Sequence, residues 1–139
     1  MTDPFDLARF VSAQQPVFED VQEELRQGRK TSHWMWFVFP QVKGLGYSRL
    51  AYTFGIASRA EAEAYLAHPV LGARLIECTQ LVNQLEGRSA EQIFGSIDAL
   101  KFRSSMTLFA AVTGDGSVFA DALRKYFDGQ PDRLTIDRL

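Results

Sequence analysis

Three side chains that could bind or act on an anion lie within four residues of one another. Lys30 is a cation, Ser32 a hydroxyl and His33 an imidazole, and an apolar segment follows them. If Ser32 caps a helix there, the N–H groups and dipole at that helix end favour bound negative charge. His33 is also a candidate general acid or base, because its pKa lies nearest neutrality. The alternative is that Ser32 only caps and His33 only packs.

A glycine-containing basic loop follows, from Gln41 to Arg49. Its glycines allow the backbone to approach a ligand closely, and Lys43 and Arg49 could hold a phosphate. It is neither a Walker loop nor a dinucleotide fingerprint, because the Gly-Lys-Ser/Thr ending and a third glycine at the right spacing are missing. An ordinary turn between helices is the alternative.

Polar groups also interrupt a strongly apolar helix predicted over residues 96–114. Lys101, Ser104 and Ser105 share a face with Ile97, Leu100, Leu108 and Val112. The opposite side carries Phe102, Met106 and Phe109, and a helix apolar nearly all round is a buried one. No acid lies between Asp98 and Asp115, so we expect Lys101 to need a distant carboxylate, carbonyl groups or a ligand. Alternatively, Lys101 extends to water.

Other chemistries are less well supported. One cysteine and two distant histidines, His33 and His68, are too few for a typical zinc site, so we predict no metal and no cofactor. Cys78 lies on an apolar helical stripe and is predicted to be core. The seven aromatic residues of 34–54 also fit a core better than a stacking platform for single-stranded nucleic acid.

Successive helices, separated by clear start and stop signals, must position these residues. Six consecutive apolar residues, 34–39, fit a buried strand or a short helix; Ser32 before them and Pro40 after them favour the helix. Ser58 and Ser89 each begin a capping-box pattern. The predicted helices span residues 5–11, 16–28, 34–39, 58–67, 69–87, 96–114 and 117–128. This pattern predicts an all-α fold, a single compact multi-helix domain over residues 1–139 with short loops.

Charge is distributed unevenly along the 139 residues, although the net charge is only −2. Residues 25–60 contain six basic residues and no acid, whereas the remainder has nine basic and seventeen acidic residues. The net charge argues against general nucleic-acid binding. The uneven distribution predicts a local positive potential on an otherwise acidic body. A single cysteine, no membrane-length apolar run and no signal-like start favour a cytoplasmic protein.

Several motifs together resemble one known family. They are residues 28–41 (GRKTSHWMWFVFPQ), 44–48, 68–75, 93–98 and 101–109, so that they are spread over nearly the whole chain. They resemble a bacterial family known as domain of unknown function 1810, whose members are often mislabelled calpastatin. The resemblance implies a single all-helical domain, and it assigns no activity, cofactor or catalytic residue.

The residues favour a site for a small anionic ligand, such as a phosphorylated metabolite or a nucleotide. The candidate catalytic residues are His33 and Lys101. The candidate ligand-binding residues are Lys30, Ser32, Trp34, Trp36, Gln41, Lys43, Arg49, Arg103, Ser104 and Ser105. We expect the segments around Lys30 and Lys101 to meet in space. The alternative is a protein-interaction module for an acidic partner; a membrane partner is not expected and a nucleic-acid partner is disfavoured.

Overall fold

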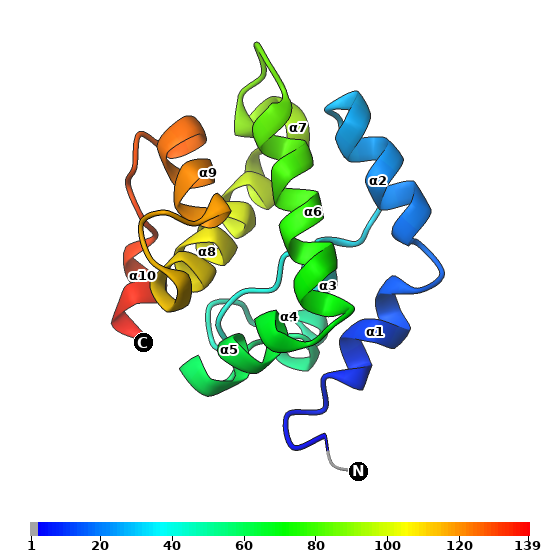
Figure 1. Ribbon diagram of the computed structural model, residues 1–139, viewed down its shortest axis with the longest axis vertical. Coiled ribbons are helices and arrows are strands. Elements are labelled where there is room, and N and C mark those ends of the chain that lie inside the picture. Colours follow the sequence, from blue (N-terminus) through cyan, green and yellow to red (C-terminus); the bar gives the residue numbers. More distant parts are fainter. Residues whose placement is uncertain (1–2) are drawn as a thin grey trace.

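The computed structural model describes residues 3–139 as an all-α protein. Ten helices occur in this part of the chain. They are α1 (Ala8–Gln14), α2 (Phe18–Gln27), α3 (Met35–Val38), α4 (Arg49–Thr53), α5 (Arg59–Ala67), α6 (Leu71–Gln84), α7 (Ala90–Phe94), α8 (Ser96–Thr113), α9 (Val118–Phe127) and α10 (Arg133–Asp137). In Figure 1, α6 runs through the middle of the molecule, with α2 on one side and α8 and α9 on the other. The predicted all-α class is confirmed.

Local capping explains where several helices begin. The hydroxyls of Ser58, Ser89 and Ser117 each accept a backbone N–H three residues ahead, as caps of α5, α7 and α9. Ser89 forms a full capping box with Gln92. Ser58 makes only half of one, because the carboxylate of Glu61 turns to the N–H of Ala57.

Other predicted boundaries were wrong by a few residues. The opening helix is α1, which starts at Ala8 and not at Phe5, and α2 starts at Phe18, two residues after Pro16. The helix predicted over 69–87 spans only 71–84. At its start, His68 Nδ1 accepts hydrogen bonds from the backbone N–H groups of Val70 and Leu71. The helix predicted over 96–114 is close to its prediction: α8 spans 96–113 and follows Gly95. The helix predicted over 34–39 is present as α3, but only residues 35–38 are helical.

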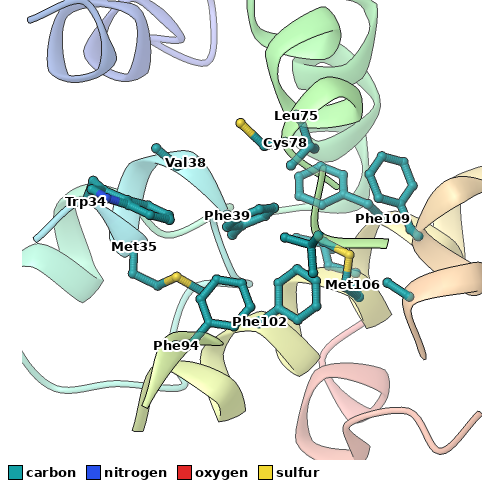
Figure 2. Packing of buried hydrophobic residues seen from close by; sticks show 14 of the residues in the cluster. Trp34, Met35, Val38, Phe39, Leu75, Cys78, Phe94, Phe102, Met106 and Phe109 are labelled. Carbon is teal, nitrogen blue, oxygen red and sulfur yellow. The ribbon is translucent and has the colours of Figure 1, made fainter. Parts of the chain in front are cut away.

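One aromatic core joins α3, α6, α7 and α8 (Figure 2). The ring of Phe39 lies 5.0 Å from that of Phe102 and 5.9 Å from that of Phe94, edge to face in both cases. Cys78 contributes from α6, as predicted, together with Leu75 one turn earlier on the same helix. The aromatic residues of 34–54 divide: Trp34 and Phe39 are buried, whereas Tyr47 and Tyr52 are exposed.

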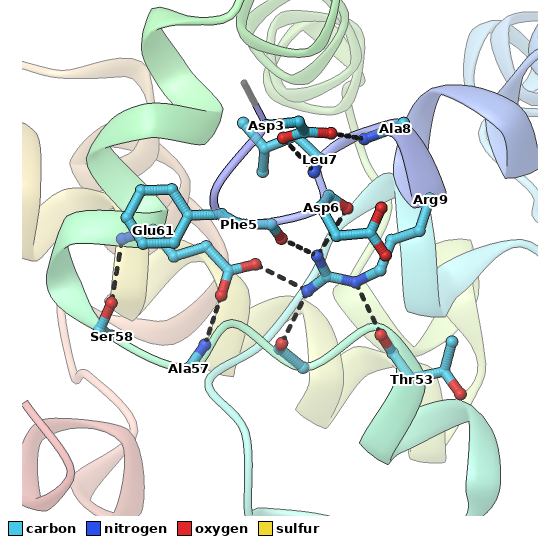
Figure 3. A network of polar contacts seen from close by, with 11 residues as sticks. Asp3, Phe5, Asp6, Leu7, Ala8, Arg9, Thr53, Ala57, Ser58 and Glu61 are labelled. Carbon is cyan, nitrogen blue, oxygen red and sulfur yellow. Dashed lines mark hydrogen bonds and ion pairs between the residues drawn. The ribbon is translucent and has the colours of Figure 1, made fainter. Parts of the chain in front are cut away.

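A buried ion pair, absent from the sequence-based prediction, ties the N-terminal segment to α5 (Figure 3). Arg9 Nη2 lies 2.6 Å from Glu61 Oε2, and the side chains are only 17% and 4% exposed. The remaining N–H groups of Arg9 donate to the carbonyls of Phe5, Asp6, Thr53 and Gly55. All donors of Arg9 are therefore used internally, which indicates a structural role.

Candidate functional site

A groove of about 330 Å³ lies beside α8, and we refer to it as the α8 groove. One wall is the face of α8 from Ile97 to Ser104. The second is Trp36 with the following segment, through Gln41, Leu45 and Gly46. The third comes from Asp132 and Leu134, at the start of α10. Five predicted ligand-binding or catalytic residues line it: Trp36, Gln41, Lys101, Arg103 and Ser104.

Lys101, one of the residues that line this groove, lies over an aromatic ring. Its Nζ is 4.0 Å from the centre of the Trp36 ring and 3.0 Å from Asp98 Oδ1. The sequence-based expectation of no nearby acid for Lys101 was wrong, because Asp98 is three residues earlier on the same helix. That spacing places two side chains on one face, so the sequence did contain this signal.

Lys30 reaches the same carboxylate from the other predicted segment. Its Nζ lies 2.8 Å from Asp98 Oδ2 and 5.1 Å from the centre of the Trp34 ring. Burial of Asp98 would by itself raise its pKa, but the hydrogen bonds from Lys30 and Lys101 outweigh burial and lower the pKa below its usual value. The segments around Lys30 and Lys101 do meet, as predicted, and Asp98 joins them. They do not share a cavity, because Lys30 is not among the residues that line the α8 groove.

The groups expected to bind an anion near Ser32 are held by a carboxylate of the chain itself. The Glu24 carboxylate accepts hydrogen bonds from the backbone N–H groups of Thr31 and Ser32. It also accepts hydrogen bonds from the Ser32 hydroxyl at 2.6 Å and from the Trp34 indole N–H at 2.9 Å. Ser32 therefore does not cap α3, whose first turn has no side-chain cap. Burial alone would raise the pKa of Glu24, but these hydrogen bonds outweigh it and lower the pKa from 4.5 to about 2.

Other predicted site residues lie elsewhere. Lys43 lies 4.4 Å from the centre of the Tyr52 ring, and Arg49 is exposed on α4. Ser105 is fully buried, and within residues 3–139 its hydroxyl has no hydrogen-bond partner. His33 is exposed and is not among the residues that line the α8 groove. A catalytic role for His33 stays a prediction.

The predicted apolar stripe on α8 was wrong at its first turn. Ile97 and Leu100 are 71% and 64% exposed at the rim of the groove, beside Leu134 at 64%. Leu108 is buried as expected, so the helix is exposed at its start and buried farther along. Three exposed aliphatic side chains around one hollow form an apolar surface of the kind that binds ligands or partners.

The basic residues of 25–60 are mostly not neutralised by ion pairs. Lys30 pairs with Asp98, and Arg26 lies 3.9 Å from Glu23. Within residues 3–139, no acid lies within ion-pair distance of Arg29, Lys43, Arg49 or Arg59. The expectation that this stretch is not neutralised pair by pair is therefore confirmed for these four residues.

Over the described residues, His, Cys, Asp and Glu side chains form no group of three or more that could hold a metal ion. In the same part of the chain, no helix combines the length and apolarity needed to cross a membrane.

Comparison with known proteins gives two matches. A family model described as protein of unknown function (DUF1810) matches residues 4–139. The chain is 60% identical to the conserved hypothetical protein Rv1873 from Mycobacterium tuberculosis, known from a crystal structure at 1.38 Å; the match covers 99% of this chain and 98% of that one, with a TM-score of 0.97. No curated protein matches the chain.

Proposed function

We propose that this chain, which belongs to the DUF1810 family of proteins of unknown function, binds a small anionic ligand in the α8 groove. This ligand joins an apolar or aromatic body to an anionic group, as a nucleotide or a phosphorylated metabolite does. The observation that carries the proposal is the position of two cations, Lys101 and Arg103, in a groove whose other walls are largely apolar.

The size and lining of the groove fit such a ligand. Small-molecule sites are typically about 300–1,000 Å³, mostly apolar, with a few polar groups that fix orientation. The α8 groove, at about 330 Å³, lies at the small end of that range. Trp36, Leu45, Leu100 and Leu134 provide apolar contact for the body of the ligand.

Both cations retain donors for an anion. Arg103 uses Nε and Nη2 for the carbonyls of Gln130 and Pro131, and within residues 3–139 its Nη1 has no hydrogen-bond partner. Lys101 has three N–H donors, of which one faces Asp98. The acid that lines the groove, Asp132, already accepts hydrogen bonds from Thr135 and lies 3.0 Å from the Ser104 hydroxyl.

Ligand binding should be detectable as a change in the contact between the Lys101 ammonium group and the Trp36 ring. An anion that draws the ammonium group from the ring changes the environment of the Trp36 indole. Trp34, which is buried and bonded to Glu24, provides an internal reference in the same molecule.

The test is a titration of the ¹⁵N-labelled protein, followed through its two indole N–H signals in NMR spectra. Adenosine monophosphate, adenosine and ribose 5-phosphate are compared, since the last two each lack one half of the proposed ligand. We expect the nucleotide to shift the Trp36 signal and leave that of Trp34 in place, and each half to bind at least roughly tenfold more weakly. Equal binding of ribose 5-phosphate would contradict the apolar half of the proposal.

A screen of phosphorylated metabolites by the same signals covers ligands that lack an adenine ring. Lys101→Met should weaken any hit about tenfold or more and change the melting temperature little, because its charge partner Asp98 keeps Lys30. Arg26→Met is the matched control, since Arg26 is an exposed cation outside the groove. If all screened anions leave the Trp36 signal unchanged, the proposal is wrong.

A further inference from the structure

Residues 43–55 form a compact loop whose two ends are joined by backbone hydrogen bonds. At its base, the N–H of Lys43 donates to the carbonyl of Ile56 at 2.8 Å, and the N–H of Ile56 donates to the carbonyl of Gln41 at 2.9 Å. An isolated bridge between Val42 and Ile56 thus closes the loop, and α4 forms part of it. Compact loops with adjacent ends are frequently functional. We call this segment the 43–55 loop.

Close packing fixes the inner side of the 43–55 loop. Ala51 is buried, and a Cβ at Gly46 would lie 2.9 Å from the Cβ of Ala51. A Cβ at Gly55 would lie only 2.8 Å from the Cα of Lys43. The ring of Phe54 packs 5.4 Å from that of Phe37. The loop therefore presents a preformed outer surface, which lowers the entropic cost of binding a partner.

The outer surface of the 43–55 loop is aromatic and basic. Tyr47 is fully exposed, Tyr52 is 71% exposed, and Leu50 and Arg49 are exposed beside them on α4. Lys43 stacks on Tyr52. The loop contains no acid, and within residues 3–139 neither Lys43 nor Arg49 forms an ion pair. Tyrosine and arginine, with tryptophan, are enriched at the energetic centres of protein interfaces.

We propose that the 43–55 loop is a docking surface for another protein, whose matching surface carries carboxylates beside an apolar patch. Charge complementarity selects this partner, because two cations without acidic partners flank exposed tyrosine and leucine side chains. The acidic remainder of the chain disfavours a polyanion such as nucleic acid, which would meet that field over a longer distance. The proposal goes beyond ligand binding in the α8 groove, to which this loop contributes only Leu45 and Gly46.

The experiment selects peptides from a displayed random library on the full chain and removes those that bind the Tyr47→Ser/Arg49→Ser/Tyr52→Ser variant. We expect enriched peptides with Asp or Glu next to apolar residues. A synthetic version of an enriched peptide should bind the Arg49→Ser variant at least roughly tenfold more weakly than the unchanged protein. Its binding to the unchanged protein should also weaken in high salt. Leu100→Ala, in the α8 groove, and Arg26→Ala, an exposed cation elsewhere, should leave that affinity unchanged.

Three results would overturn the proposal. If every peptide that binds the full chain is removed by the triple variant, the binding surface lies elsewhere. A labelled oligo(dT) strand that binds the wild type and not the triple variant would assign the loop to nucleic acid. A dimer in light scattering, lost in the triple variant, would assign it to a second copy of this chain. Circular dichroism and thermal melting of each variant show that it remains folded, so that lost binding is not mistaken for unfolding.

Discussion

The indole N–H of Trp34 donates to the carboxylate of Glu24 at 2.9 Å, and this bond fixes the segment before α3 against α2. Three further donors from Thr31 and Ser32 reach the same carboxylate. A loop with the composition of an anion site is thus folded around an anion of its own chain.

Acidification should weaken the fold through Glu24. Its pKa is lowered from 4.5 to about 2, so its stabilising contribution is complete above the unfolded value and is lost as pH falls from about 4.5 towards 2. Glu24→Gln should remove much of this pH dependence and lower the free energy of unfolding at pH 7 by about 1–3 kcal/mol. Urea unfolding of both proteins across this pH range measures the effect. Parallel pH profiles for variant and wild type would contradict it.

Asp98 should be coupled more strongly to Lys30 than to Lys101. The side chain of Lys30 is 7% exposed and that of Lys101 19%, so the first ion pair is less screened by water. Double-mutant cycles with Asp98→Asn should give about 1.5–3 kcal/mol for Lys30→Met and about 0.2–0.5 kcal/mol for Lys101→Met. Chemical denaturation provides the four free energies of each cycle. Equal or reversed coupling energies would show that burial does not decide the order.

Removing Arg9 should strongly destabilise the protein. Arg9→Met leaves the buried carboxylate of Glu61 without its cation and should cost about 3–5 kcal/mol. The double variant Arg9→Met/Glu61→Gln should recover part of that loss. Arg124→Met is the matched control: its ion pair with Asp121 is more than half exposed, so about 0–1 kcal/mol is expected. Similar losses for Arg9→Met and Arg124→Met would refute the structural role of Arg9.

Leu75 tests the packing of α6. Leu75→Ala removes a fully buried side chain and should lower the free energy of unfolding by about 2–5 kcal/mol. Its neighbour Ile76 is 39% exposed, so Ile76→Ala should cost less than about 1 kcal/mol. The comparison holds helix, temperature and denaturant constant. A loss below about 1 kcal/mol at Leu75 would mean that the buried stripe is misassigned.

Cys78 should react slowly in the folded protein. Burial raises the pKa of its thiol to about 12, so the reactive thiolate is scarce at neutral pH. Alkylation by iodoacetamide, followed by mass spectrometry, should be at least roughly tenfold slower than in guanidinium chloride. Rapid modification under native conditions would indicate that α6 opens readily.

Features determined by local spacing could be predicted from the sequence. Leu71, Leu75, Cys78 and Val82 recur on one face of a helix in any context, and a serine cap such as Ser117 acts on the next turn of its own helix. Gly28 ends α2 in the left-handed conformation, as expected of a glycine at that place.

Features that depend on distant parts of the chain could not. Ser32 looks like a cap, but its hydroxyl bonds to Glu24, which packing brings close from the preceding helix. The ion pair of Arg9 and Glu61 joins residues 52 positions apart. The five-residue helices α4 and α10 carry too few residues for a periodic pattern, so the third wall of the α8 groove was not foreseen.

That third wall has a consequence for how the protein is made. Asp132 is held by the Ser104 hydroxyl and by the N–H contact of its backbone with Thr107, and both partners lie on α8, at least 25 residues earlier in the chain. A chain emerging from the ribosome therefore presents α8 before the residues that enclose its groove have been added. During that interval Leu100 faces an open side, and the hollow is complete only when residues 132–134 have emerged and packed against α8.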